Sequence, residues 1–374
     1  MSTPLRVAMI GAGFMGAAHS QAWRTAPRVF ALPRDVELTV VAGRDAGRTA
    51  AAAARWGWAE STVDWRNAVA RDDIDVVDVC TPGDTHAEIA IAALRAGKHV
   101  LCEKPLANSV VEAEAMAAAA EDSPARAMVG FTYRRVPAVT LARDLVADGA
   151  IGELRQARAV YLQDWLADEN APHTWRLDKA ISGSGALGDI GAHIIDAVQF
   201  VSGQRVDAVS GLLRTFVTER PAGSGRAPVT VDDAAVFTGT LSGGGIATFE
   251  ASRVATGRKN ALRFELSGSA GAIAFDLERL NELELYRAAD GPTAGFRRIL
   301  ATEPEHPYVA AWWPPGHGLG YEHGFSHQVK DLVEAIDGGH RPRPSFADGL
   351  QVQRVLAAVE QSAGHGSAWV PVPA

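Results

Sequence analysis

The sequence predicts an α/β protein, with a doubly wound parallel sheet first and then an α+β domain built on a large, open, mostly antiparallel sheet. Three observations predict this fold class. The first 130 residues alternate short apolar strands with alanine-rich helical stretches, as parallel sheets covered by helices do. After residue 130 the chain shows runs of strands with few helices between them. Its 374 residues exceed one ordinary core, so we expect two domains, 1–130 and 131–374.

The elements of each domain follow in order along the chain. In the first domain, apolar runs predict strands at 5–10, 36–42, 75–80, 99–102 and 127–130, and helices are expected at 15–25, 50–56, 85–96 and 110–120. In the second domain, strands are expected at 152–165, 235–241, 246–251 and 261–267, with glycines 243–245 turning one hairpin. We expect one amphipathic helix at 185–202, late helices at 325–336 and 347–363, and long loops at 221–228 and 303–320.

Composition excludes several classes of protein. The chain has 36 basic and 44 acidic side chains, and a net charge of −8 argues against nucleic acid or an anionic membrane as the main partner. Two cysteines, Cys80 and Cys102, are too few for a disulfide framework or a four-cysteine zinc site, and we expect no metal. No run approaches the roughly 18 apolar residues of a membrane-spanning helix, and no targeting pattern is visible. These features predict a cytoplasmic protein.

A glycine-rich turn joins the first strand to the first helix. Gly11, Gly13 and Gly16 form the pattern GxGxxG, with Phe14 and Met15 between the last two glycines. Glycine permits a tight turn and the close approach of a pyrophosphate, and the helix N-terminus that follows offers free N–H groups to phosphate. Because the pattern stands at a strand–helix junction of an alternating chain, it predicts a Rossmann domain that binds a dinucleotide.

The end of the second strand bears on which dinucleotide is bound. In NAD enzymes an acidic residue at this place binds the adenosine ribose. Here Gly43 occupies that position, followed by Arg44 and Asp45. Arg44 either accommodates a 2′-phosphate or is a solvated loop charge, and Asp45 is still within reach of a ribose. The pattern leaves the choice between NAD and NADP open and slightly favours acceptance of NADP.

Two further segments carry chemistry. Lys104 follows Glu103 at the carboxyl end of a buried strand, the edge at which open α/β sheets bind ligands. Asp189 and His193 are four residues apart and share one face of the expected helix, which suits acid–base catalysis at neutral pH. The alternatives are a Glu103–Lys104 ion pair, polar surface residues on the helix, and half of a metal site. The opposite face of that helix carries the apolar stripe Leu187, Ile190, Ile194, Val198 and Val201.

At these motifs the chain resembles the glucose–fructose oxidoreductase/inositol dehydrogenase (Gfo/Idh/MocA) family. The likeness spans essentially the whole chain, and its matching pieces are residues 11–16, Thr81-Pro82 with His86, Glu103-Lys104-Pro105, and Asp189 with His193. A narrower likeness, to levoglucosan dehydrogenase-like members, is carried by residues 161–165 and 183–189. There are two departures from the pattern: Gly43 replaces the ribose-binding acid, and Thr132 stands where many relatives have asparagine.

The resemblance implies an NAD(P)-dependent dehydrogenase that oxidises a ring secondary hydroxyl of a neutral sugar, anhydro-sugar or cyclitol. It implies Lys104, Asp189 and His193 as the catalytic residues, with His193 as the base and Lys104 stabilising the alkoxide. The residues expected at the cofactor are Gly11, Gly13, Phe14, Met15, Gly16, Gly43, Arg44, Asp45, Thr81, Pro82, His86, Glu103 and Lys104. Those expected at the substrate are Tyr133, Gln163, Trp165, Trp175, Arg176, Asp189 and His193. Large sheets pair between subunits in relatives, so a homodimer or homotetramer is expected.

Two other functions stay open at this point. Some relatives use tightly held NAD to cleave glycosides, and one branch senses ligands without catalysis. Turnover without added cofactor would favour the first, whereas the presence of Lys104, Asp189 and His193 together argues against the second. Aromatic residues such as Tyr133 and Trp165 either cover the apolar faces of a sugar or pack the core. Few clustered bases accompany them, which argues against a sugar phosphate.

Overall fold

The computed structural model describes residues 3–373, and the chain divides into two compact units. The N-terminal unit runs to Thr132 and also contains residues 320–350, and the C-terminal unit contains 133–319 and the residues after 350. The first division lies two residues from the expected boundary. Residues 320–350 were expected in the second domain but belong to the N-terminal unit. The reason is that helix α9 (Tyr321–Asp337) packs against helix α1 (Phe14–Val29).

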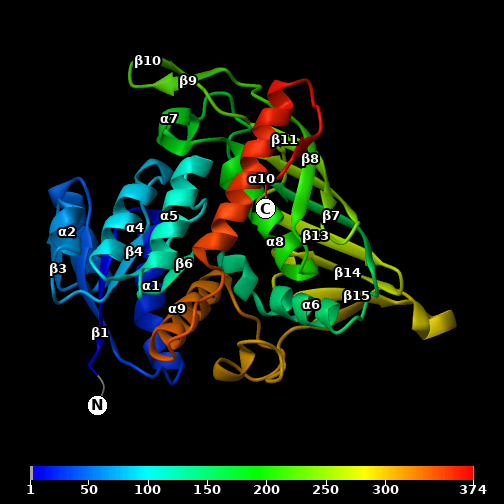
Figure 1. The fold of residues 1–374 in the computed structure, drawn as a ribbon, viewed down its shortest axis with the longest axis horizontal. Coiled ribbons are helices and arrows are strands. Elements are labelled where there is room, and N and C mark those ends of the chain that lie inside the picture. Colours follow the sequence, from blue (N-terminus) through cyan, green and yellow to red (C-terminus); the bar gives the residue numbers. More distant parts are fainter. Residues whose placement is uncertain (1–2, 374) are drawn as a thin grey trace. The chain divides into compact units, whose positions relative to one another are not determined.

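The N-terminal unit is built on a six-stranded parallel sheet in the order β3-β2-β1-β4-β5-β6 (Figure 1). Its strands are β1 (Leu5–Ile10), β2 (Val36–Ala42), β3 (Glu60–Thr62), β4 (Val76–Val79), β5 (His99–Cys102) and β6 (Ala127–Val129). The remaining helices are α2 (Ala46–Trp56), α3 (Trp65–Val69), α4 (His86–Arg95) and α5 (Val110–Asp122). The order reverses beside β1, and this is where doubly wound sheets bind nucleotides.

The C-terminal unit is built on a nine-stranded sheet in the order β16-β15-β14-β13-β7-β12-β11-β8-β17. Its strands are β7 (Leu154–Leu162), β8 (Val206–Arg214), β11 (Ala234–Leu241), β12 (Ile246–Ser252), β13 (Ala261–Gly268), β14 (Gly271–Asp276), β15 (Glu282–Arg287), β16 (Arg297–Leu300) and β17 (Val370–Pro371). Only β7 and β12 pair in parallel within this sheet. The predicted fold class, including a mostly antiparallel second sheet, is confirmed.

Helices cover one face of this large sheet. The helices α6 (Pro137–Ala147) and α8 (Ala192–Ser202) pack on it, and the inward rings of Phe237 and Phe249 stack with centroids 4.6 Å apart. The opposite face carries exposed side chains, since strand residues point alternately to the two faces. The other helices of this unit are α7 (Lys179–Ser182) and the C-terminal part of α10 (Phe346–Gly364).

Two expectations for the C-terminal unit are wrong in detail. The segment 185–202 is not one regular helix, because residues Leu187–Gly191 are π-helical and α8 begins only at Ala192. The predicted apolar stripe of that segment is buried as expected. Residues 221–228 are not a long loop but most of a hairpin, β9 (Glu219–Ala222) with β10 (Gly225–Pro228). Gly223 turns this hairpin at a φ of 58°, which few other residues tolerate.

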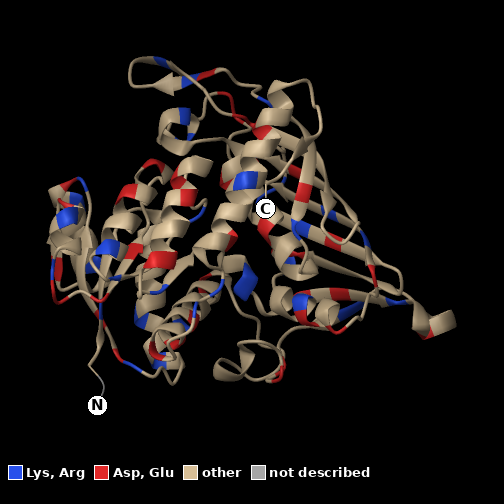
Figure 2. Ribbon diagram, viewed as in Figure 1, with Lys and Arg blue, Asp and Glu red and all other residues tan. Residues whose placement is uncertain are grey.

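The charged side chains of the two units are mixed in sign. Figure 2 shows acidic and basic residues interspersed along the helices and strands. This distribution agrees with the net charge of −8 in arguing against a polyanionic partner. Among the described residues, no helix combines the length and hydropathy needed to cross a bilayer.

Candidate active site

The glycine-rich turn leaves open space where a phosphate is expected. Gly11 has a φ of 119°, and a Cβ there would lie 2.6 Å from the Cys80 carbonyl oxygen. A Cβ on Gly16 would lie 2.0 Å from the Gly11 carbonyl oxygen, so these two glycines are required by the fold itself. Gly13 differs, because a Cβ there meets nothing within 4 Å. Gly13 is also the N-cap of α1 and gives that helix no side-chain cap, which leaves the helix N-terminus suited to an anion.

The loop after β2 explains the missing ribose-binding acid. A Cβ on Gly43 would lie 2.5 Å from the Thr49 hydroxyl oxygen and 3.3 Å from the Ala12 side chain. A carboxylate at position 43 therefore has no room. The Asp45 carboxylate accepts a hydrogen bond of 2.8 Å from the Arg48 backbone N–H and so caps α2, while Arg44 is exposed. The Asp45 side chain is also exposed, so both charged groups of this loop face solvent.

The loops after β4 and β5 are joined by a buried histidine. The ring nitrogens of His86 lie 2.9 Å from the Thr81 carbonyl oxygen and 3.0 Å from that of Pro105. His86 therefore fixes the Thr81-Pro82 turn beside the segment that carries Lys104. Glu103 is buried, and its carboxylate accepts a hydrogen bond of 3.2 Å from the Lys104 backbone N–H.

The π-helical segment Leu187–Gly191 positions the second group of expected residues, Asp189 and His193. The buried Asp232 carboxylate accepts hydrogen bonds of 2.7 and 2.8 Å from the backbone N–H groups of Gly185 and Leu187. Burial raises the pKa of Asp232, and these N–H donors oppose that rise. Asp189 and His193 are only partly buried, although most of their neighbours in the segment are fully buried. This arrangement exposes one carboxylate and one imidazole on a rigid helix, and π-helical turns are frequent at functional sites.

A hydrogen-bonded row of polar side chains extends beside His193. The Tyr133 and Tyr161 hydroxyls lie 2.9 Å apart, and the Tyr161 hydroxyl donates to the Asn260 side-chain oxygen at 2.7 Å. Gln163 donates to the same oxygen at 2.8 Å, and the indole N–H of Trp165 donates to Gln163 at 3.0 Å. The His193 ring lies 4.7 Å from that of Tyr133 and 5.8 Å from that of Tyr161. Hydroxyl, amide and aromatic groups of this kind suit a carbohydrate.

Arg253 links the other expected substrate residues. This arginine is fully buried, and its guanidinium nitrogen lies 3.6 Å from the Asp189 carboxylate. It donates to the Arg176 carbonyl oxygen at 3.4 Å, and its centre lies 5.6 Å from the centre of the Trp165 ring. Arg176 in turn stacks on the Trp175 ring at 4.4 Å.

The structure thus gathers all seven expected substrate residues in the C-terminal unit and places Lys104 with the expected cofactor residues in the N-terminal unit. Three residues of this neighbourhood escaped the sequence analysis, namely Asp232, Arg253 and Asn260. No motif surrounds them, because each contacts a segment that is far away in sequence. Thr132, the second departure from the family pattern, uses its hydroxyl to donate to Gln328 at 2.8 Å in the N-terminal unit.

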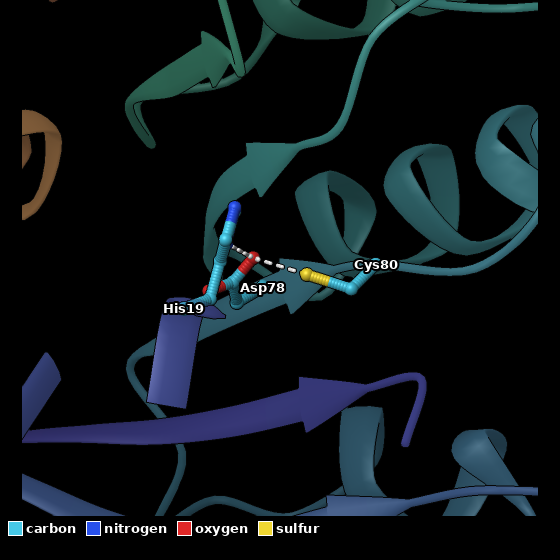
Figure 3. Close-up of side chains that lie close together, drawn as sticks. All are labelled: His19, Asp78 and Cys80. Carbon is cyan, nitrogen blue, oxygen red and sulfur yellow. Dashed lines mark hydrogen bonds and ion pairs between the residues drawn. The ribbon is translucent and has the colours of Figure 1, made fainter. Parts of the chain in front are cut away.

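One further cluster has the residue types of a metal site. Ligand atoms of His19, Asp78 and Cys80 all lie within 4.8 Å of one another (Figure 3). Both His19 ring nitrogens, however, face carboxylate oxygens, and burial raises the pKa of the Cys80 thiol far above its usual value. The groups bind one another, so we assign no metal to this cluster.

Substituting Arg253 tests its place in the site. We expect Arg253→Met to lower kcat/KM for the sugar by about 10- to 100-fold, the usual effect of losing a residue that orients a reacting group. Arg253→Lys keeps the charge and is expected to lose less. Steady-state kinetics with a melting curve of each variant gives the comparison. Unchanged kcat/KM in a folded Met variant would remove Arg253 from the site.

Comparison with known proteins agrees with this geometry. Residues 5–131 match the model of an oxidoreductase family with an NAD-binding Rossmann fold, and residues 139–274 match that of the GFO/IDH/MocA C-terminal domain. Levoglucosan dehydrogenase of Pseudarthrobacter phenanthrenivorans is 43% identical, over 99% of this chain and 98% of that protein. The crystal structure of an oxidoreductase domain protein from Kribbella flavida is 64% identical, with a TM-score of 0.98 and 100% of both chains covered. A structure of levoglucosan dehydrogenase in complex with NADH and levoglucosan is 43% identical, with a TM-score of 0.96 and the same full coverage. The chain belongs to the Gfo/Idh/MocA family of NAD-binding oxidoreductases.

Proposed function

We propose that the protein oxidises a ring secondary hydroxyl of a neutral sugar, anhydro-sugar or cyclitol and transfers the hydride to a nicotinamide. The observation that carries the proposal is the arrangement around His193: a partly buried imidazole beside two tyrosines, followed by a row of amide and indole groups. Such a row recognises uncharged hydroxyl groups. The relative crystallised with NADH and levoglucosan supports the same substrate class.

The proposed chemistry divides one oxidation between a base, a cation and the cofactor. His193 accepts the proton of the substrate hydroxyl, since its ordinary pKa lies near neutrality. Lys104 stabilises the negative charge that develops on the alcohol oxygen, and Asp189, backed by Arg253, orients the hydroxyl. A bound nicotinamide would supply the acceptor for the hydride that leaves the carbon. The open space at Gly13 and the uncapped helix N-terminus suit its pyrophosphate.

A substrate panel tests the proposal. Levoglucosan, myo-inositol, glucose and glucose 6-phosphate are compared at equal concentration with NAD+ and with NADP+, and reduction of the nicotinamide is followed by its absorbance. We expect a neutral compound to have the highest kcat/KM. Preference for the phosphate ester would contradict the substrate class. Cleavage of a glycoside without added cofactor would instead favour the redox-assisted hydrolase, and ligand binding without any turnover would favour the sensing function.

For the cofactor we propose that Arg44 permits NADP in addition to NAD. The support is its exposure at the end of β2 together with the lack of room for an acid at Gly43. We expect Arg44→Asp to lower the ratio of kcat/KM with NADP to that with NAD by about tenfold, because a carboxylate repels the 2′-phosphate. Arg48→Asp is the matched control, one turn further along and also exposed. An unchanged ratio in Arg44→Asp would make this arginine a bystander.

We also propose that the protein is a homodimer or homotetramer that pairs through the open face of its nine-stranded sheet. Leu212, Val236 and Ile246 are more than half exposed on this face, and Leu212 and Val236 are register partners on adjacent strands. An exposed apolar pair on adjacent strands, with Ile246 further along the same face, favours association. Light scattering gives the mass in solution, and a monomeric protein would contradict the proposal.

A further inference from the structure

A buried network of charged groups surrounds His19 in the N-terminal unit. His19 lies on α1, the helix that begins at the glycine-rich turn, and is 1% exposed. Its Nδ1 atom lies 2.9 Å from an Asp78 carboxylate oxygen, and its Nε2 atom lies 3.0 Å from a Glu103 carboxylate oxygen. Figure 3 shows Asp78 at the centre, with His19 and Cys80 as its neighbours. The ring is thus held between two carboxyl groups from β4 and from the end of β5.

The geometry calls for a proton on both ring nitrogens. A neutral imidazole donates from one nitrogen only, and its other lone pair would then face a carboxylate oxygen. Burial by itself lowers the pKa of His19, but Asp78 and the Cys80 thiol outweigh this effect and hold the pKa well above 6.5. A positively charged ring places a cation between the carboxyl groups of Asp78 and Glu103, and buried charges are tolerated when they are paired.

The network continues from His19 to the backbone of Lys104. One Glu103 oxygen faces the His19 ring, and the other accepts a hydrogen bond of 3.2 Å from the Lys104 N–H. Gly130 makes room for this carboxylate, since a Cβ there would lie 2.7 Å from its oxygen. The segment after Lys104 is held separately, through His86 and the Pro105 carbonyl. His19 therefore contacts the carboxyl group that accepts the hydrogen bond from the Lys104 backbone.

We propose that His19 is a positioning residue that orients Lys104 by holding the Glu103 carboxylate, and that it ties this lysine to the helix expected to receive the cofactor phosphates. The proposal rests on the role of Lys104 in the proposed function. Residues that contact a reacting group on the side away from the substrate hold its position within the small tolerance that catalysis allows. The competing reading is a purely structural one, in which His19 only satisfies Asp78, as the Trp23 indole N–H does at 2.7 Å.

Two isosteric amides separate these readings. In His19→Gln the amide nitrogen stands near the place of Nε2 and can donate toward Glu103, whereas in His19→Asn it stands near Nδ1 and can donate toward Asp78. We expect His19→Asn to lower kcat by about 10- to 100-fold and His19→Gln by about fivefold or less, with the cofactor Kd nearly unchanged in both. Trp23→Phe removes a second donor to Asp78 and leaves the Cys80 thiol as another, so this variant is expected to lower the melting temperature but not kcat. Equal loss of kcat in the two amides, or a similar loss in Trp23→Phe, would overturn the proposal.

A second measurement follows Lys104 without any substrate. The chain has five lysines, so reductive ¹³C-methylation gives five lysine methyl signals, and Lys104→Met assigns the one of interest. We expect His19→Asn to shift the Lys104 signal and to leave those of Lys98, Lys179, Lys259 and Lys330 in place. Glu103→Gln is expected to shift the same signal, and this variant replaces His19→Asn if the latter does not fold. An unmoved Lys104 signal would refute the positioning role. A moved signal in a protein that oxidises no sugar would instead refute the proposed function.

Discussion

Lys104→Met and His193→Ala are each expected to lower kcat by roughly 100-fold or more while leaving cofactor affinity within a few-fold of wild type. In the proposed mechanism, the lysine substitution removes the cation that stabilises the alkoxide, and the histidine substitution removes the base. Both act on one proton transfer, so the double variant is expected to be far less impaired than the product of the single effects. Steady-state kinetics on the best substrate of the panel, with cofactor titration by fluorescence, measures both quantities.

Matched controls exist for both substitutions. Lys98→Met removes a lysine of the same unit whose ammonium donates to the Arg71 carbonyl oxygen at 2.8 Å, and we expect kcat to remain near wild type. His173→Ala removes a histidine whose ring nitrogen lies 3.1 Å from the Pro228 carbonyl oxygen, and we expect kcat to remain near wild type here too. Near-wild-type turnover in Lys104→Met or His193→Ala would eliminate the assigned mechanism.

Gly13→Val is expected to weaken dinucleotide binding by more than about 100-fold, because two methyl groups then occupy the space into which the pyrophosphate must come. The fold should survive. The φ and ψ of Gly13, −95° and −160°, are extended, and its Cβ position is open. Replacing glycine by valine at an N-cap costs only about 1 kcal/mol. Calorimetric titration of the folded variant measures the affinity.

The neighbouring glycine gives a contrast within the same turn. Gly16→Ala is expected to destabilise the unit itself, since its Cβ would meet the Gly11 carbonyl oxygen. Gly295→Val adds the same side chain at another open position and should change neither binding nor stability. Retained affinity in Gly13→Val would take the turn out of the cofactor site.

Much of the N-terminal unit could be predicted from the sequence, because the patterns that indicate its strands, helices and turn are local. Strands 5–10, 36–42 and 99–102 are predominantly apolar, and the three glycines mark a single turn at a tight strand–helix junction. The hairpin at 219–228 was missed because the prediction relied on local patterns there too. Its two prolines suggest a loop, yet Pro221 and Pro228 occupy a ladder of only two short strands, where a missing N–H is tolerated.

The parts of the site that stayed hidden depend on contacts across the sheet. No residue near Arg253 in the sequence indicates that its guanidinium contacts Asp189. Likewise, no residue near Asp232 indicates that its carboxylate accepts a hydrogen bond from the Gly185 N–H. The π-helical turn could not be predicted either. An apolar stripe with a period near 3.6 residues indicates an ordinary α-helix, and it does not show where one extra residue widens a turn. Periodicity identifies which face is buried, but the backbone hydrogen-bond pattern is decided by what packs on it.

The packing of Gly43 against Thr49 makes evolution of the cofactor loop depend on the order of mutations. A Cβ at position 43 would lie 2.5 Å from the Thr49 hydroxyl oxygen, so we expect a substitution to aspartate alone to destabilise this loop. Shortening residue 49 first removes that obstacle, but it also removes the hydroxyl that donates to the Asp45 carbonyl oxygen. The two positions are therefore epistatic. A lineage with this loop reaches an acidic ribose contact only through an intermediate whose α2 start is weakened, and this tends to preserve its glycine.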